Sequence, residues 1–325
     1  MALCDPEVGR RYGQAVSSEE IPGINLELVT NWLVDNVPDV EAPFSFDQIT
    51  GGHSNLTFRV TDGEGRNLVL RRPPLTAVLA TAHDMVREHW VISAFGPTPV
   101  ACPETLALCT DESVNGAPFY VMDFVDGVVL HDRAVTAESV PLDRRIKLSE
   151  SVIDTLAALH SANPDSIGLG DLGRRSGYVE RQLKRWQGQW EKTKTRELPA
   201  MDRTYELLLE HLPEEKYNTV VHGDYRLGNM LITPDTGAVA AVLDWELCTL
   251  GDPLADLGYL LNNWVEPGEA DLVAGATDFP TADGGFLSRD ELIDRYAAAT
   301  GFDVENADYY RAFQFWRLGA IVEGV

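Results

Sequence analysis

The pattern of hydrophobic and polar positions divides the chain into a β-rich first half and a mostly helical second half. Hydrophobic and polar residues alternate through 44–50, 56–60 and 67–72, and turn-forming segments separate these runs. Alternation with a period of two is typical of half-buried strands. A helical pattern follows at 83–95, and a hydrophobic run that ends in a glycine occupies 117–127. These elements predict a compact lobe of mixed α and β structure.

The second half follows helical spacing, with one β insertion at 218–246. Inside the insertion, the residues Pro234 to Gly237 form a turn signal between two strands. The predicted helices span 144–163, 177–194, 201–212, 252–264 and 288–300, with a further one from 315 onwards. We therefore expect an α+β protein with two lobes.

The expected boundaries give three parts. Residues 1–40 form an N-terminal extension, in which 26–37 has the spacing of an amphipathic helix. The N-lobe follows at 41–127 and the C-lobe at 128–325.

Charge and cysteine content narrow the functional classes. The 325 residues carry a net charge of −25, from 26 basic and 51 acidic side chains. Such a surface repels nucleic acid and anionic membranes, so neither is expected as a partner. The four cysteines form no CxxC pair, there is no apolar signal-peptide core, and no apolar run is long enough to span a membrane. We expect a cytoplasmic protein with reduced thiols.

A short polar stretch inside the β insertion carries the candidate chemistry. In VVHGDYRLGNMLI, Gly223 allows a tight turn that presents Asp224, and Asn229 follows before the strand resumes. The next strand pair returns Asp244 towards the same place. Oxygen atoms of Asn229 and Asp244 suit Mg²⁺, which prefers oxygen ligands together with substrate phosphates. Asp224 is then available to accept the proton of an incoming hydroxyl group.

The order and spacing of these residues resemble a known family. Kinase-type phosphoryl transfer uses a catalytic Asp, an Asn five positions later and a metal-binding Asp, in this order. The segments HGDYRLGN and LDWE are similar to those of the aminoglycoside phosphotransferase and choline kinase superfamily. They most resemble the phosphotransferase-like domains that some proteins carry fused to acyl-CoA dehydrogenases. The resemblance begins near Phe44 and implies a protein-kinase-like fold, with an antiparallel sheet in the N-lobe and a mostly helical C-lobe.

The resemblance also implies a nucleotide site in the N-lobe. Backbone N–H groups of the loop in ITGGHSN would cover the phosphates. The expected strand lysine is absent from NLVLRR, and alternation places Val69 and Arg71 on one face of the sheet. Val69 would lie over the adenine, and Arg71 would bind phosphates with a helical glutamate as its partner. The candidates are Gly51, Gly52, Ser54, Asn55, Val69, Arg71 and Glu88.

The segment FYVMDFVDG resembles the hinge between the lobes of such enzymes. Met122 would lie at the back of the adenine pocket. The backbone of Asp123 and Val125 would form hydrogen bonds with the adenine edge. A plain buried strand is the alternative interpretation.

Supporting residues are implied in the C-lobe. Asp256 would hydrogen-bond the backbone of the catalytic loop, and His222 would orient that loop without exchanging protons. Arg226 follows Asp224 closely and would help to neutralise the transferred phosphoryl group; an exposed loop arginine is the alternative. Glu246 is expected either at the metal or as an acidic wall for a cationic substrate.

The sequence therefore predicts a Mg²⁺-dependent O-phosphotransferase that moves the γ-phosphoryl group of ATP or GTP to a hydroxyl group of a small molecule. Two acceptor classes remain open. The acidic charge favours an aminoglycoside-like or other cationic compound, and the resemblance favours a hydroxyacyl-CoA. A CoA thioester needs a basic patch, for which the segment RRSGYVERQLKRW is the candidate, although a solvated helix face explains it as well.

Two other classes of protein remain as alternatives. Replacement of the usual lysine by Arg71 is the only support for a nucleotide-binding scaffold without turnover. A metal-dependent hydrolase built on His222 would need more histidine ligands than this region offers. The sequence leaves the oligomeric state open.

Overall fold

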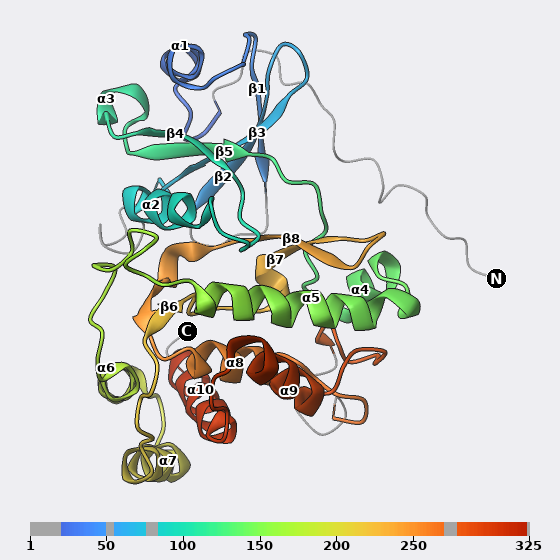
Figure 1. Ribbon diagram of the computed structural model, residues 1–325. Coiled ribbons are helices and arrows are strands. Elements are labelled where there is room, and N and C mark those ends of the chain that lie inside the picture. The colour runs from blue at the N-terminus through green and yellow to red at the C-terminus, as the bar shows by residue number, and fades with distance from the viewer. Residues whose placement is uncertain (1–20, 50–54, 76–83, 270–277, 324–325) are drawn as a thin grey trace, which may run out of the picture.

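The computed structural model describes residues 21–49, 55–75, 84–269 and 278–323. It has two lobes, with a sheet-containing N-lobe above a mostly helical C-lobe in Figure 1. The expected two-lobed α+β architecture is therefore confirmed.

The N-lobe contains an antiparallel sheet with the strand order β1-β2-β3-β5-β4. Alternation separates its two faces, because Val69 joins the core shared with the C-lobe while Leu70 joins a second core inside the N-lobe. The strands are β1 (Ser45–Ile49), β2 (Leu56–Thr61), β3 (Asn67–Arg72), β4 (Thr105–Cys109) and β5 (Phe119–Asp123).

Helices cover both faces of this sheet. The face towards the C-lobe packs against α2 (Met85–Phe95), and the outer face packs against α1 (Leu26–Asn36), next to which α3 (Glu112–Asn115) lies. The expected helix within 26–37 is present. Its buried positions are Val29 and Leu33, whereas Leu26 and Leu28 are 47% and 42% exposed.

The C-lobe is built around a long central helix, α5, with α9 along one side of it and a β-hairpin along the other (Figure 1). Its helices are α4 (Arg133–Ser139), α5 (Leu142–Ser161), α6 (Tyr178–Thr193), α7 (Pro199–Glu210), α8 (Leu254–Asn262), α9 (Arg289–Thr300) and α10 (Ala307–Val322). None of the helices in the described ranges combines the length and apolar character needed to cross a membrane.

Two small antiparallel sheets flank the segment that carries the predicted residues Asp224 and Asn229. The strand pairs are β6 (Thr219–Val221) with β9 (Thr249–Gly251), and β7 (Met230–Thr233) with β8 (Ala238–Val242). One-turn 3₁₀ helices, η1 (Leu227–Asn229) and η2 (Trp245–Leu247), lie at the start of β7 and beyond the end of β8.

The connection between the lobes lies against this hairpin. Val128 and Ile232 exchange two backbone hydrogen bonds, with N–O distances of 2.9 and 3.0 Å. The contact needs a glycine at 127, because a Cβ atom there would lie 2.9 Å from the Cβ atom of Leu231. The hinge and the catalytic hairpin are therefore joined.

Candidate active site

The catalytic loop leaves β6 through a glycine turn. Gly223 has a φ of +86°, and a Cβ atom on it would lie 3.0 Å from the carbonyl oxygen of Leu247. An L-residue with a side chain is strained at this φ and has no room here. This turn directs Asp224 out of the strand, as the sequence pattern predicts.

Asp256, in the first turn of α8, holds the backbone of the loop from below. Its carboxylate accepts hydrogen bonds from the N–H groups of His222 (2.5 Å) and Gly223 (2.9 Å), and lies 3.3 Å from Nε2 of His160. Burial raises the pKa of Asp256, but His160 and the backbone donors outweigh it, so that the pKa lies below its ordinary value. A buried carboxylate that is held ionised in this way fixes two consecutive peptide groups of the loop.

His222 is fully buried and its two ring nitrogens are both engaged. Nδ1 accepts the N–H of Asp224 (3.2 Å), so Nε2 carries the proton and donates it to the carbonyl of Leu243 (2.9 Å). Both ring nitrogens are therefore occupied by the backbone of the loop and of the segment before Asp244. The orienting role of His222 stays a prediction.

Asn229 ties the two ends of the loop together. Its Nδ2 donates to the carbonyl oxygen of Asp224 (2.8 Å) and to the Oδ2 of Asp224 (2.6 Å). On the other carboxylate oxygen, Oδ1, the Nε of Arg226 lies at 3.5 Å. The side-chain oxygen of Asn229 accepts no hydrogen bond from the described residues, so it is available as an oxygen ligand.

Asp244 follows β8 with a left-handed backbone, at φ 64° and ψ 62°. Asp tolerates this conformation better than most residues with a side chain. Its Oδ1 accepts a hydrogen bond from Nη2 of Arg71 (2.8 Å), and the Nε of Arg71 donates to Glu88 (3.1 Å). Arg71 therefore links a strand, a helix and the segment after the hairpin.

The Arg71 cluster is largely shielded from water, because the side chains of Arg71 and Glu88 are 15% and 2% exposed. Burial lowers the pKa of the Arg71 guanidinium, but the charges of Glu88 and Asp244 raise it by more, so that its net pKa is raised. Burial raises the pKa of Glu88, and attraction to Arg71 offsets only part of this rise. The guanidinium stays charged and is held in place by two carboxylates.

The donor set fits a hard divalent cation. Asn229 offers its amide oxygen, and Asp244 offers a carboxylate that is 33% exposed and has only Oδ1 bonded to Arg71. Both are oxygen ligands, which suit Mg²⁺. Among the described residues, no group of three or more His, Cys, Asp or Glu side chains could hold a metal ion without further ligands. A metal here would depend on phosphate oxygens and water.

Two of the residues predicted on the adenine side lie next to each other. Val69 and Met122 are partners in the β3–β5 register and are each 7% exposed. The N–H of Asp123 donates to the carbonyl of Glu104 (2.8 Å), so this N–H is not available for an adenine edge. The N–H of Val125 makes no hydrogen bond within the described residues.

The glycine-loop prediction can be followed only in part. Gly51, Gly52 and Ser54 lie outside the described residues. Asn55 is 8% exposed, and its Nδ2 donates to the Oε2 of Glu246 at 3.4 Å. The end of this loop therefore contacts the segment that follows Asp244.

Several residues near the site were not singled out from the sequence. Arg87 in α2 donates to the carbonyls of Glu246 and Cys248, beside η2. Burial, and then the charge of Asp224, raise the pKa of the phenol of Tyr259 in α8. The only sequence signal for Arg87 is that it directly precedes Glu88 in the same helix.

Two of the five basic side chains in the segment proposed as a basic patch form ion pairs. Arg175 is paired with Asp165, and Lys184 is paired with Glu180 at 2.7 Å. Arg185 instead lies over the ring of Trp186, at 5.3 Å from its centroid.

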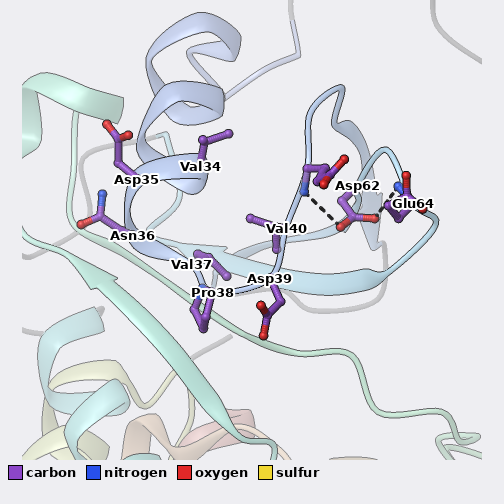
Figure 2. Close-up of a pocket in the computed structure, with 10 residues that line it drawn as sticks. Val34, Asp35, Asn36, Val37, Pro38, Asp39, Val40, Asp62 and Glu64 are labelled. Atoms are coloured by element: carbon purple, nitrogen blue, oxygen red, sulfur yellow. Dashed lines mark hydrogen bonds between the residues drawn. The ribbon is translucent and has the colours of Figure 1, made fainter.

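A cavity of about 660 Å³ lies elsewhere, at the C-terminal end of α1 (Figure 2). Acidic side chains line it, but the carboxylate of Asp62 is occupied by the backbone N–H groups of Glu41, Glu64 and Arg66. These hydrogen bonds stabilise the turn between β2 and β3. None of the predicted site residues lines this cavity.

Comparison with known proteins assigns the class. The Phosphotransferase enzyme family matches residues 45–310, and the chain belongs to this family. A putative aminoglycoside phosphotransferase from Ralstonia eutropha has a similar structure, with 34% identity, a TM-score of 0.79 and coverage of 92% of this chain and 87% of that one. The protein-kinase-like fold expected from the sequence is confirmed.

Particular relatives extend this result. Acyl-CoA dehydrogenase family member 10 of Mus musculus is 34% identical over 87% of this chain, and family member 11 of Homo sapiens is 32% identical over 88%. The chain spans only 26% and 36% of the length of these two proteins. An aminoglycoside phosphotransferase solved with streptomycin and ATP has the same fold, with 16% identity, a TM-score of 0.59 and coverage of 92% of this chain and 88% of that one.

Proposed function

We propose that this chain transfers the γ-phosphoryl group of ATP to a hydroxyl group of a small molecule. The sequence leaves ATP and GTP open, and the ATP bound by the similar streptomycin-binding enzyme favours ATP. The observation that carries the proposal is the convergence of Asp224, Asn229 and Asp244. His222 and Asn229 both hydrogen-bond Leu243, the residue before Asp244, which joins the three positions.

The residues divide the reaction between them. Asp224 accepts the proton of the acceptor hydroxyl while the acceptor oxygen bonds to the γ-phosphorus and the bond to the β-phosphate oxygen breaks, releasing ADP. Asn229 holds the Asp224 carboxylate in position, at 2.6 Å. Mg²⁺ bound by Asn229 and Asp244 would supply charge neutralisation on the phosphate oxygens. Arg71 and Arg226 supply fixed positive charge on either side of Asp224.

Positioning of the substrates and fixed charge account for most of the rate enhancement in this scheme, because the protein forms no covalent intermediate in phosphoryl transfer of this type. The acceptor is a hydroxylated small molecule, either aminoglycoside-like or another metabolite. Streptomycin and hygromycin B are bound by enzymes of the same fold, which supports a small-molecule acceptor.

The test compares Asp224→Asn with wild type in the presence of Mg²⁺, ATP and each of a panel of hydroxylated compounds. ADP release measures turnover, and ³¹P NMR identifies the phosphorylated product. Loss of the base should lower turnover by about 10²- to 10⁴-fold while ATP binding is retained. Asp235→Asn, in the exposed β7–β8 turn, is the matched control and should keep full activity.

A nucleotide-binding scaffold predicts a different result. Wild type and Asp224→Asn would then bind ATP equally well, and both would show the same near-zero turnover with every compound.

A further inference from the structure

The acceptor must approach Asp224 from the side opposite the nucleotide, because attack on the γ-phosphorus is in line with the leaving group. The nucleotide side belongs to the N-lobe. The opposite side is formed by α6, α8 and α10 of the C-lobe, with α10 packed against both α6 and α8 (Figure 1). What these helices present to the loop bears on the class of acceptor, and this step rests on the proposed function.

Arg317 in α10 contacts the catalytic loop directly. Its Nη2 donates to the carbonyl of Gly223 (3.2 Å), the residue before Asp224. Its guanidinium lies over the rings of Trp186 in α6 and Tyr259 in α8, at 5.5 and 5.8 Å from their centroids. Three helices therefore hold this charge against the residue that precedes Asp224.

The positive charge of Arg317 is not balanced by an acidic side chain. Its partners are the carbonyl of Gly223, the amide oxygen of Gln314 and the two rings, and none of the described residues forms an ion pair with it. Its Nε atom is buried and has no hydrogen-bond partner. A buried donor without a partner costs on the order of 1–3 kcal/mol, which a ligand acceptor would relieve.

A second unbalanced guanidinium shares the same indole ring. Arg185 lies 5.3 Å from the centroid of Trp186, is exposed, and forms no ion pair within the described residues. Two cations on one aromatic ring stand out in a chain with a net charge of −25. Guanidinium groups bind phosphate and carboxylate groups well and repel ammonium groups.

We propose that Arg317 and Arg185, gathered on Trp186, form a subsite for a phosphate or carboxylate group of the acceptor. The acceptor is then an anionic hydroxyl compound and not a polycationic amino sugar. Arg317 is the inner, loop-bound half of the subsite, and Arg185 is its exposed half.

The first experiment measures anion binding without turnover. The full chain is saturated with Mg²⁺ and a non-hydrolysable ATP analogue, which fills the nucleotide phosphate site, and inorganic phosphate is titrated in by calorimetry. Wild type should bind phosphate with a Kd in the millimolar range. Arg317→Gln should weaken binding about tenfold or more, and Arg185→Gln about two- to fivefold.

Arg203→Gln is the matched control, because Arg203 lies on the exposed face of α7 and is already paired with Glu206 at 2.9 Å. It should leave the phosphate affinity unchanged. The proposal is overturned if wild type shows no phosphate binding up to tens of millimolar. It is also overturned if Arg185→Gln, which does not touch the loop, binds phosphate as wild type does.

A second titration identifies the source of the anionic group. Glycerol 3-phosphate carries a hydroxyl and a phosphate on one molecule, and it should bind wild type more tightly than inorganic phosphate if the subsite serves the acceptor. Equal affinities would overturn the assignment to the acceptor and indicate a site for a free anion. Since both titrations read binding, they remain informative if Asp224→Asn shows that the proposed reaction does not occur.

Discussion

The arginines on the two sides of Asp224 have different kinds of partners. On the N-lobe side, Arg71 is held between the carboxylates of Glu88 and Asp244. On the C-lobe side, Arg317 and Arg185 are held by aromatic rings and carbonyl groups. A guanidinium paired with two carboxylates is already fixed before a ligand arrives, whereas an unbalanced one gains a partner when an anion binds.

Buried carboxylates show the same difference. Glu88 is 2% exposed and has Arg71 as a cationic partner. Asp252, at the start of α8, is also 2% exposed, but within the described part of the chain its oxygens accept hydrogen bonds only from the Leu254 N–H (3.0 Å) and the Tyr310 hydroxyl (2.7 Å). Burial raises the pKa of Asp252 to about 6. Glu88 thus has a cationic partner, whereas Asp252 joins α8 to α10 through a hydrogen bond without one.

The largest loss of activity is expected for a substitution of Asp244, which lies on the N-lobe side of Asp224 and is part of the proposed reaction centre. Asp244→Asn removes a carboxylate that Arg71 and the proposed Mg²⁺ share, so phosphoryl transfer should fall by about 10²- to 10³-fold. Asn tolerates the left-handed backbone at this position, so the melting temperature should change little. Single-turnover transfer from radiolabelled ATP and thermal unfolding measure the two quantities.

Asp244→Ala is the comparison variant for this test. It removes the same carboxylate but also places a residue that does not favour a left-handed φ at 64°, which should cost about 1–2 kcal/mol of stability in addition. Full activity of Asp244→Asn would contradict the assignment of Asp244 to the reaction centre.

The next effect concerns the buried pair itself. Glu88→Gln leaves Arg71 buried with one carboxylate instead of two, which should lower the free energy of unfolding by about 3 kcal/mol. The matched control is Glu206→Gln, in an exposed pair with Arg203, where the change should stay within about 0.5 kcal/mol. Urea denaturation measures both. Equal changes in the two variants would mean that the Arg71 cluster contributes no more than a surface pair.

The contacts on the N-lobe side of Asp224 can be predicted from the sequence better than those on the C-lobe side. Alternation in β3 places Arg71 next to the helix that carries Glu88, and the spacing around Gly223 predicts the catalytic loop. These contacts follow from local periodicity and from a motif with fixed spacing. Arg317, Trp186 and Tyr259 come from three helices that are far apart in the chain, so only tertiary packing brings them together.

Short elements escaped prediction for a related reason. The strand β9 has three residues, and it exists because β6 pairs with it. The five residues of β4 are nearly all half-buried and show no alternation of exposure. The left-handed conformation of Asp244 also has no sequence signal, since it depends on how β8 meets η2. Where neighbours decide the conformation, local propensity carries little information.

The smallest effect tests the carboxyl group without a cation, and it depends on pH. The folded pKa of Asp252, about 6, lies above its ordinary value of 3.8, so the folded state binds the proton more tightly. Its contribution to stability is therefore present below pH 4 and is lost as pH rises through about 6. Asn cannot titrate, so Asp252→Asn should be as stable as wild type at low pH and more stable by about 2 kcal/mol near neutrality.

The measurement is the difference in unfolding free energy between Asp252→Asn and wild type, followed from about pH 4 to pH 7.5. Taking the difference cancels the titration of all other groups. Asp235→Asn, in the exposed turn, should give a difference that does not vary with pH. A flat difference for Asp252→Asn as well would mean that Asp252 stays ionised at low pH through a cation near α8. The two sides of Asp224 would then differ only in how they hold their arginines, with Arg71 paired with carboxylates and Arg317 and Arg185 unpaired among the described residues.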